Sequence, residues 1–235
     1  MAQAQVGTFS MQTALGGDAA AATDRVAPDF LPFRQQIQAI GRQFHSRGWS
    51  LATSSNYSAV VGRDPLRLLI TASGKHKGEL TLEDFVLVNA VGQNVAGTAR
   101  PSAETLLHCV LAEKLPNVGA VLHTHSVWGT LLSDRHFPAG RLDICGYEMQ
   151  KGLEGVTTHE QPISIRIFEN SQDIPALAAQ LAVELAAGEP SLQYGFLLRR
   201  HGLYTWGKDL SAARRHVETL EFLFEVTARA AGMTC

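Results

Sequence analysis

The sequence is poor in cysteine and has no long hydrophobic run. Its three cysteines, Cys109, Cys145 and Cys235, show no paired spacing, unlike the disulfide framework of a small secreted domain. We interpret them as free thiols in a reducing cytoplasm. No apolar stretch approaches the roughly 20 residues that a helix needs to cross a bilayer. The sequence therefore predicts a cytoplasmic protein without a membrane partner.

An excess of charge of one sign is also missing. The formal net charge is −2, and no basic stripe with interleaved aromatic residues indicates a nucleic-acid partner. Residues 1–27 lack the basic segment and apolar core of a signal peptide, so they are predicted to form a flexible N-terminal arm. Residues 28–235 are predicted to form one globular domain, because they contain no linker or low-complexity tract and the apolar fraction of 45% is ordinary for a globular chain.

Helix and strand patterns alternate through this domain. Apolar residues at helical spacing predict helices over residues 33–47, 102–114, 173–187 and 210–231. Short apolar runs predict strands over residues 66–71, 85–90, 118–125, 196–201 and 203–206. Ser102 and Asp173 stand where helix N-caps are expected. The alternation indicates a single α/β or α+β domain with a central sheet.

Three histidines form a candidate metal site. His123 and His125 are two residues apart at the end of an apolar strand, so both imidazoles face one side. His201 follows another apolar run and precedes Gly202, which permits a close backbone approach. Catalytic zinc commonly takes three protein ligands and keeps one position open. The spacing of the pair alone fits two polar residues at a strand end equally well, and the six remaining histidines are interpreted as ordinary surface or core residues.

Two glutamates are candidates for moving a proton. Glu104 stands in the first turn of a predicted helix, and Glu148 stands in a segment between the histidine pair and His201. Taken alone, Glu104 is better interpreted as a carboxylate favoured by the helix dipole, and the alternative for Glu148 is a solvated loop acid. Both alternatives remain open at the level of single residues.

Three polar turns could bind a phosphate. They contain Ser54-Ser55-Asn56, Thr71-Ala72-Ser73-Gly74-Lys75 and Pro101-Ser102. Hydroxyl groups, turn amides and a helix start are the usual components of anion sites, and Lys75 would add positive charge. Each turn alone is better interpreted as an ordinary polar loop.

The order of these motifs resembles that of the class II aldolase/adducin family. The resemblance covers residues 37–224 and rests on five motifs, which are Ser55-Asn56, Ile70-Thr71-Ala72-Ser73-Gly74, Pro101-Ser102-Ala103-Glu104, His123-Thr124-His125 and Arg199-Arg200-His201-Gly202. It implies a three-layer α-β-α fold with a central, mostly antiparallel sheet flanked by helices. Family members are usually tetramers with the site near a subunit interface, so a homotetramer is expected. One departure is Ser55, where aldolases of the family usually carry glycine.

The resemblance also implies roles for individual residues. One zinc ion per subunit would be held by His123, His125 and His201. The substrate phosphate would be bound by Ser55, Asn56, Ser73, Gly74, Lys75 and Ser102. Residues 146–152 are most similar to members that dehydrate 5-methylthioribulose 1-phosphate in methionine salvage, and in those members the residue matching Glu148 is the catalytic acid/base. In the aldolases the residue matching Glu104 does the corresponding work.

The expected reaction is therefore a dehydration that gives 2,3-diketo-5-methylthiopentyl 1-phosphate through a zinc-stabilised enediolate and loss of the C4 hydroxyl. Partial burial that raises the pKa of Glu148 would suit this residue to both proton transfers. Two other functions remain open. One is a sugar-phosphate aldolase or 4-epimerase on the same zinc site, and the other is an adducin-like binding module without catalysis.

Overall fold

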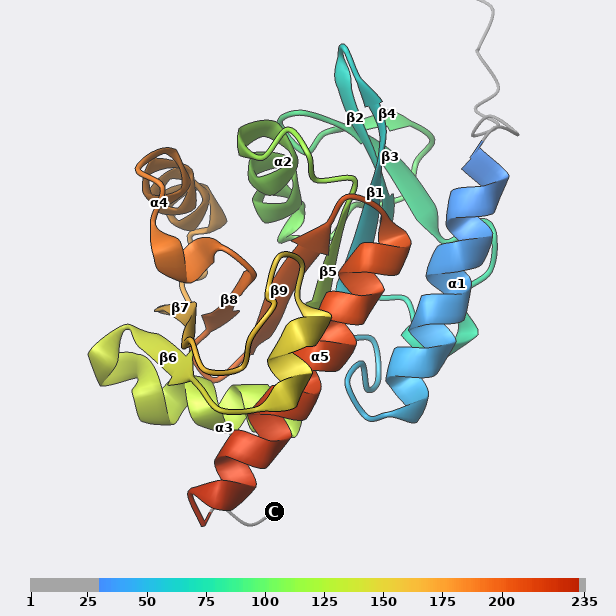
Figure 1. Cartoon of the computed structure of the whole chain (residues 1–235). Coiled ribbons are helices and arrows are strands. Elements are labelled where there is room, and N and C mark those ends of the chain that lie inside the picture. Colours follow the sequence, from blue (N-terminus) through green and yellow to red (C-terminus); the bar gives the residue numbers. More distant parts are fainter. Residues whose placement is uncertain (1–29, 233–235) are drawn as a thin grey trace, which may run out of the picture.

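The computed structural model describes residues 30–232 (Figure 1). The predicted N-terminal arm and Cys235 lie outside these residues. The described part contains one mixed sheet and five α-helices. The helices are α1 (Leu31–Ser46), α2 (Thr105–Lys114), α3 (Val127–His136), α4 (Ile174–Ala186) and α5 (Leu210–Ala230). No helix in residues 30–232 is long and apolar enough to cross a membrane.

The sheet has nine strands and is almost entirely antiparallel. Its strands are β1 (Asn56–Arg63), β2 (Leu66–Thr71), β3 (Phe85–Asn89), β4 (Asn94–Ala96), β5 (Ala120–Thr124), β6 (Arg141–Ile144), β7 (Ile163–Phe168), β8 (Gly195–Leu198) and β9 (Gly202–Gly207). Their order across the sheet is β4-β3-β2-β1-β5-β9-β8-β7-β6. Only β7 and β8 pair in parallel. The predicted architecture, a mostly antiparallel central sheet flanked by helices, is confirmed.

Helices cover both faces of the sheet and produce three layers (Figure 1). On one face, α1 and α5 pack over the half that contains β1 and β5, while α3 and α5 pack over β6 to β9. On the other face, α2 and α4 bury Phe196, Leu198 and Trp206, and α2 also covers β2 and β3. Each strand in the middle of the sheet is therefore buried on both sides, which holds β1, β5 and β9 in a fixed relation.

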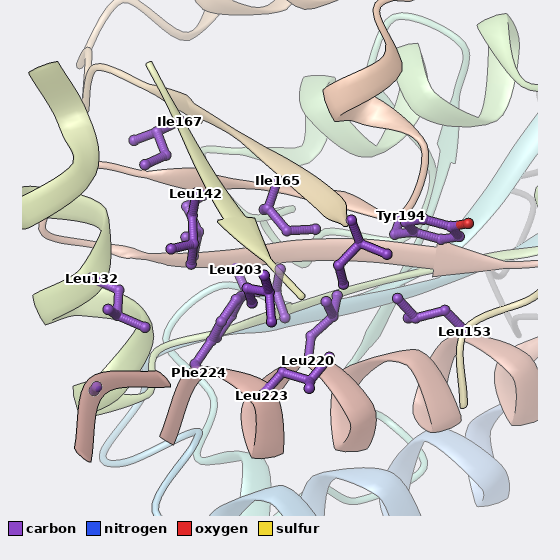
Figure 2. Packing of buried hydrophobic residues seen from close by; sticks show 14 residues of the cluster. Leu132, Leu142, Leu153, Ile165, Ile167, Tyr194, Leu203, Leu220, Leu223 and Phe224 are labelled. Atoms are coloured by element: carbon purple, nitrogen blue, oxygen red, sulfur yellow. The ribbon is translucent and has the colours of Figure 1, made fainter. Parts of the chain in front are cut away.

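Figure 2 shows the hydrophobic core between α5 and the sheet. Leu220, Leu223 and Phe224 from α5 belong to one core cluster with Leu203 of β9 and Leu142 of β6, and all five side chains are fully buried. Full burial of a leucine or phenylalanine side chain contributes about 2 kcal/mol. This packing anchors β9 immediately after His201, so the core supports the candidate metal site.

Two predicted helix starts have different outcomes. Asp173 caps α4, since its carboxylate accepts a hydrogen bond from the Ala176 amide at 3.0 Å. Ser102 does not cap α2, and that prediction is wrong. The chain makes a turn from Ser102 to Thr105, and Glu104 takes the cap position. The Ser102 hydroxyl accepts hydrogen bonds from the Glu104 backbone amide within this turn and from the Asn56 side-chain amide.

The predicted strand over residues 196–201 is too long. β8 ends at Leu198 because residues 199–201 form a turn, with Arg200 at a φ of 55°. Four strands were not predicted. They are β1, which lies beside β5 within the sheet, β4 at one edge, and β6 and β7 at the other edge. Cys109 and Cys145 are free thiols, as expected.

Candidate metal centre and substrate cleft

Strand register brings distant residues to one end of the sheet. Asn56 begins β1 and is paired with His123 of β5, which is paired in turn with Tyr204 of β9. Gly202 begins β9 beside the end of β5, where a Cβ atom would lie only 2.0 Å from the Thr124 carbonyl oxygen. The predicted close approach at Gly202 is therefore real, and it places His201 beside the histidine pair.

The three predicted histidines converge on one point. Their candidate ligand atoms all lie within 4.8 Å of one another. His123 Nε2 lies 3.3 Å from His201 Nε2 and 2.8 Å from His125 Nε2. The Nδ1 atoms of His123 and His201 are used elsewhere, facing the Leu203 carbonyl at 2.9 Å and the Asn170 side-chain oxygen at 3.0 Å. We infer that both Nδ1 atoms carry the proton, which leaves the Nε2 lone pairs free for a metal.

The surroundings of all three imidazoles favour the neutral form. Burial lowers the pKa of His123 well below its usual value, and the charges of its two histidine neighbours lower it further. Burial likewise lowers the pKa of His125 to about 3. Burial also lowers the pKa of His201, although Glu104 opposes this shift. Neutral imidazole is the form that ligates a metal, so the environment prepares the group for a cation.

Glu104 lies against the histidines at the start of α2. Its two carboxylate oxygens lie 3.5 Å from His123 Nε2 and 3.4 Å from His201 Nε2. Converging lone pairs and a carboxylate repel one another unless a proton or a cation lies between them. Three imidazole nitrogens with a nearby carboxylate are a donor set that suits zinc. The residues present therefore fit a bound divalent metal.

A buried histidine fixes the orientation of Asn56. His108 lies one helical turn after Glu104, and its Nδ1 atom is 2.8 Å from the Ser58 hydroxyl. Its Nε2 atom faces the side-chain oxygen of Asn56, and burial lowers the His108 pKa to about 3, which keeps the ring neutral. The Asn56 amide group is thereby aimed at Glu104, to which it donates a hydrogen bond of 2.9 Å.

The three-histidine group lies at a cleft of about 290 Å³. Five of the six predicted phosphate-binding residues line it, namely Ser55, Asn56, Ser73, Gly74 and Ser102. Glu104, His125 and His201 line the same cleft, together with Lys77, which the sequence analysis did not single out. A cavity of about 320 Å³ between residues 155–164 and 190–194 contains none of the predicted residues.

Two predicted residues do not line this cleft. The Lys75 ammonium forms a 2.7 Å ion pair with Asp84 at the surface. Glu148 is 71% exposed and pairs with Lys151 at 2.8 Å and with His159 at 3.0 Å. The hydrogen bond from Lys151 is the main cause that lowers the Glu148 pKa. The expectation of a raised pKa at Glu148 is therefore wrong for the single chain, because the carboxyl is solvated and ion-paired rather than partly buried.

Several functional contacts were missed in the sequence. Asn170, His108 and Lys77 support or line the site, and Tyr204 stacks on His123 with ring centres 3.9 Å apart. One signal was available for His108, because it follows Glu104 by four residues and so shares its helix face. Asn170 carried no such signal, since its contact with His201 spans 31 residues of sequence.

The fold and the site together define a class, a three-layer α/β domain with a three-histidine metal group at one end of its sheet. Residues 35–228 match the model of the Class II Aldolase and Adducin N-terminal domain. The chain belongs to this family.

Relatives and solved structures agree with this assignment. The chain is 51% identical over 192 residues to methylthioribulose-1-phosphate dehydratase of Marinobacter nauticus, covering 81% of this chain and 90% of the relative. It is 50% identical over 191 residues to the protein of the same name in Pseudomonas aeruginosa, covering 81% and 91%. An L-fuculose 1-phosphate aldolase superposes with a TM-score of 0.70 at 19% identity, covering 90% of both chains. The L-fuculose-1-phosphate aldolase of Thermus thermophilus gives a TM-score of 0.67 at 22% identity, covering 85% and 95%. These two aldolases share the fold.

Proposed function

We propose that the protein is a zinc-dependent hydro-lyase that dehydrates 5-methylthioribulose 1-phosphate to 2,3-diketo-5-methylthiopentyl 1-phosphate in methionine salvage. The observation that carries the proposal is a single cleft that joins the three-histidine group to polar turns suited to a phosphate. The relatives named methylthioribulose-1-phosphate dehydratase, half identical over 81% of the chain, indicate which sugar phosphate it is.

His123, His125 and His201 would hold the zinc ion through Nε2. When bound, zinc supplies a Lewis acid that polarises a carbonyl oxygen and stabilises negative charge developing beside it. Glu104 lies next to this position and is held by the Asn56 amide at 2.9 Å. In this proposal Glu104 balances the charge of the zinc ion. After Glu148, it is the second candidate for the group that moves a proton of the substrate.

The phosphate would occupy the part of the cleft formed by the polar turns. Ser55, Ser73 and Ser102 offer hydroxyl groups there, and Asn56 offers an amide. Gly74 has a φ of 73°, and no atom lies within 4 Å of where its Cβ would be. The backbone at Gly74 is therefore open to an approaching phosphate oxygen.

Glu148 is the proposed acid/base. Its carboxylate would remove the proton from C3, which leaves an enediolate spread over the C2 and C3 oxygens. Collapse of this charge expels the C4 hydroxyl, which takes the proton back from Glu148 and leaves as water. The remaining enol at C3 and C4 tautomerises to the diketone. Because Glu148 does not line the cleft of its own chain, we propose that it acts at the cleft of a second copy.

A homo-oligomer is thus part of the same proposal. We expect a homotetramer that works in the cytoplasm with one zinc ion per subunit. The exposed position of Glu148 supports a neighbouring copy, since an acid/base must come within hydrogen-bond reach of the reacting carbon. Packing against a second copy would also desolvate the carboxyl and raise its pKa.

A sugar-phosphate aldolase or 4-epimerase is the second candidate. The two aldolases that share the fold favour it, and the same metal group would serve its chemistry. Their identities of 19% and 22% to this chain are far below the 51% of the dehydratase relative, so the dehydration is preferred.

The substitution Glu148→Gln tests the assignment of the acid/base. The variant should bind zinc like the unmodified protein but lose most dehydration, because loss of a general acid/base costs about 100- to 10,000-fold in rate. Metal analysis and a product assay on the same preparation measure both effects. Normal turnover by the variant would show that Glu148 is not the base.

A further inference from the structure

Lys77 is a buried lysine at the wall of the cleft. It is 1% exposed and lines the same cleft as Ser55, Ser73 and His125. Lys75, only two residues earlier, is 47% exposed and pairs with Asp84. The two lysines therefore differ in kind, since Lys75 is a solvated surface cation and Lys77 is a desolvated one.

The Lys77 ammonium has unused hydrogen-bonding capacity. Its Nζ donates one hydrogen bond, to the Lys75 carbonyl at 2.7 Å. Within residues 30–232, no carboxylate forms an ion pair with it, because the nearby Asp84 is engaged by Lys75. Burial lowers the Lys77 pKa to about 8, against the raising effect of the Asp84 charge. An ammonium group has three N–H donors, and leaving a buried cation without a paired anion is costly.

The backbone of Lys77 is fixed in place by α1. Lys77 begins a short 3-10 helix, η2 (Lys77–Glu79), that packs on α1. A Cβ at Gly41 of α1 would lie 2.2 Å from the Lys77 carbonyl oxygen, and a Cβ at Gly78 would lie 2.9 Å from the ring of His45. Both glycines permit a contact that other residues would prevent. The backbone that carries the Lys77 side chain is therefore held in a fixed position, as a preorganised binding site requires.

The basic and the acidic side chain of the cleft, Lys77 and Glu104, have different surroundings. Lys77 and His125 line the same cleft, and the positive charge of Lys77 lowers the pKa of His125. Among the residues that line the cleft, Glu104 is the only acid, and it faces the histidine nitrogens. The hydroxyl-bearing turns and Lys77 form the remaining polar wall, which favours an anion.

We propose that Lys77, rather than Lys75, is the cation that binds the phosphate of the substrate. This inference rests on the proposed function and deepens it by naming the charge that the phosphate meets. A phosphate monoester carries two negative charges near neutral pH and offers three acceptor oxygens. It matches an ammonium with two free donors beside the turns at Ser55 and Ser73. The bound phosphate would then supply the counter-charge that the protein does not.

Binding of glycerol 3-phosphate to the zinc-loaded protein tests this inference, with glycerol as the uncharged probe. Lys77→Met removes the charge and the donors, and Lys77→Gln removes the charge while keeping a donor for the Lys75 carbonyl. Lys75→Met tests the rival assignment, and Lys114→Met, on the far end of α2, is the matched control. Calorimetry gives the dissociation constants, and metal analysis and circular dichroism report zinc content and folding.

Both Lys77 variants should bind glycerol 3-phosphate at least tenfold more weakly with unchanged zinc content, whereas Lys75→Met and Lys114→Met should change binding less than threefold. Two results would overturn the inference, a change below threefold in Lys77→Gln or a larger loss in Lys75→Met than in Lys77→Met. Failure of the unmodified protein to bind the phosphate would overturn it as well. Failure of the proposed function looks different, since the unmodified protein would then bind the phosphate but not dehydrate 5-methylthioribulose 1-phosphate.

Discussion

Ser55 occupies a backbone conformation that suits glycine. Its φ of 71° lies in the left-handed region, which costs a residue with a Cβ about 1 kcal/mol or more. This explains why the aldolases of the family usually carry glycine there. Unlike glycine, Ser55 brings a hydroxyl group, and the residue lines the cleft. In the proposed function this hydroxyl binds substrate, which would explain why a strained residue stands here.

The substitution Ser55→Gly should therefore separate stability from binding. We expect the free energy of unfolding to stay equal or rise by up to about 1 kcal/mol, because relief of strain outweighs the added freedom of the unfolded chain. The KM for the sugar phosphate should rise several-fold. Ala52→Gly is the control, since Ala52 also has a positive φ, of 52°, but does not line the cleft, so its KM should not change. Chemical denaturation and steady-state kinetics measure both, and a clear loss of stability in Ser55→Gly would contradict the account.

The histidine group could be predicted from the sequence, but its supports could not. Two histidines at a spacing of two on a strand must share a side, and Gly202 marked the close approach that His201 needs. The partners that orient them come from unrelated segments, such as Asn170 for His201. The exposure of Glu148 and the burial of Lys77 are likewise set by tertiary packing, which neighbouring sequence does not encode.

At the scale of elements, α5 packs against β5, the strand that carries His123. Glu221 of α5 is 2% exposed, and it accepts a 2.7 Å hydrogen bond from the hydroxyl of Thr124, which lies between His123 and His125. Burial raises the Glu221 pKa to about 7, although the hydroxyl neighbours oppose the shift. A carboxyl in this position is neutral in the folded chain over a pH range where the unfolded chain ionises it.

The unfolding free energy should consequently depend on pH through Glu221. Because the folded pKa is raised above the unfolded value, the stabilising effect is complete below about pH 4.5 and is lost as the pH rises through about 7. Glu221→Gln, which cannot ionise, should exceed the unmodified protein in stability at pH 8 by roughly 1–3 kcal/mol. Denaturation series at pH 5.5 and pH 8 measure the difference, and an advantage that is equal at both pH values would refute the assignment.

Long helices with a regular apolar period were predictable, whereas the inner strand β1 and the short edge strands β4 and β6 were not. α4 and α5 begin and end within about a residue of their predicted bounds, because the period of 3.6 residues runs over several turns. β6 has four residues and lies at the sheet edge, where half of its side chains face solvent. β7 has the alternation Ile163, Ile165 and Ile167, and this period of two was the available signal for a strand.

At the scale of the whole molecule, one chain does not bring all the proposed catalytic groups together. His125, His201, Glu104 and Lys77 line one cleft, while Glu148 lies on the surface. The short helix η4 (Glu148–Gly152) packs on α5, where a Cβ at Gly152 would lie 2.2 Å from the Thr219 hydroxyl. This close contact fixes the segment against α5, and the proposal that Glu148 acts at a second copy starts from this position.

Mixed oligomers test whether the site is shared between copies. His201→Ala should lose both zinc and activity, and Glu148→Gln should keep zinc but lose activity. Co-expression of the two variants with different tags should restore activity up to about one quarter of the unmodified level, which is the fraction of sites that combine intact histidines with an intact Glu148 from a neighbour. The same variants expressed separately are the controls. No recovery in oligomers shown to contain both variants would place Glu148 at its own chain's cleft or outside catalysis.

The product formed from 5-methylthioribulose 1-phosphate by the zinc-loaded protein is the most direct test of the central claim. Mass spectrometry of the reaction should show a single phosphorylated product lighter than the substrate by one water, formed by the unmodified protein and lost on removal of zinc with a chelator. Dihydroxyacetone phosphate with methylthioacetaldehyde would instead indicate cleavage between C3 and C4, as in an aldolase. A product of unchanged mass would indicate epimerisation, and either result would contradict the assignment as a dehydratase.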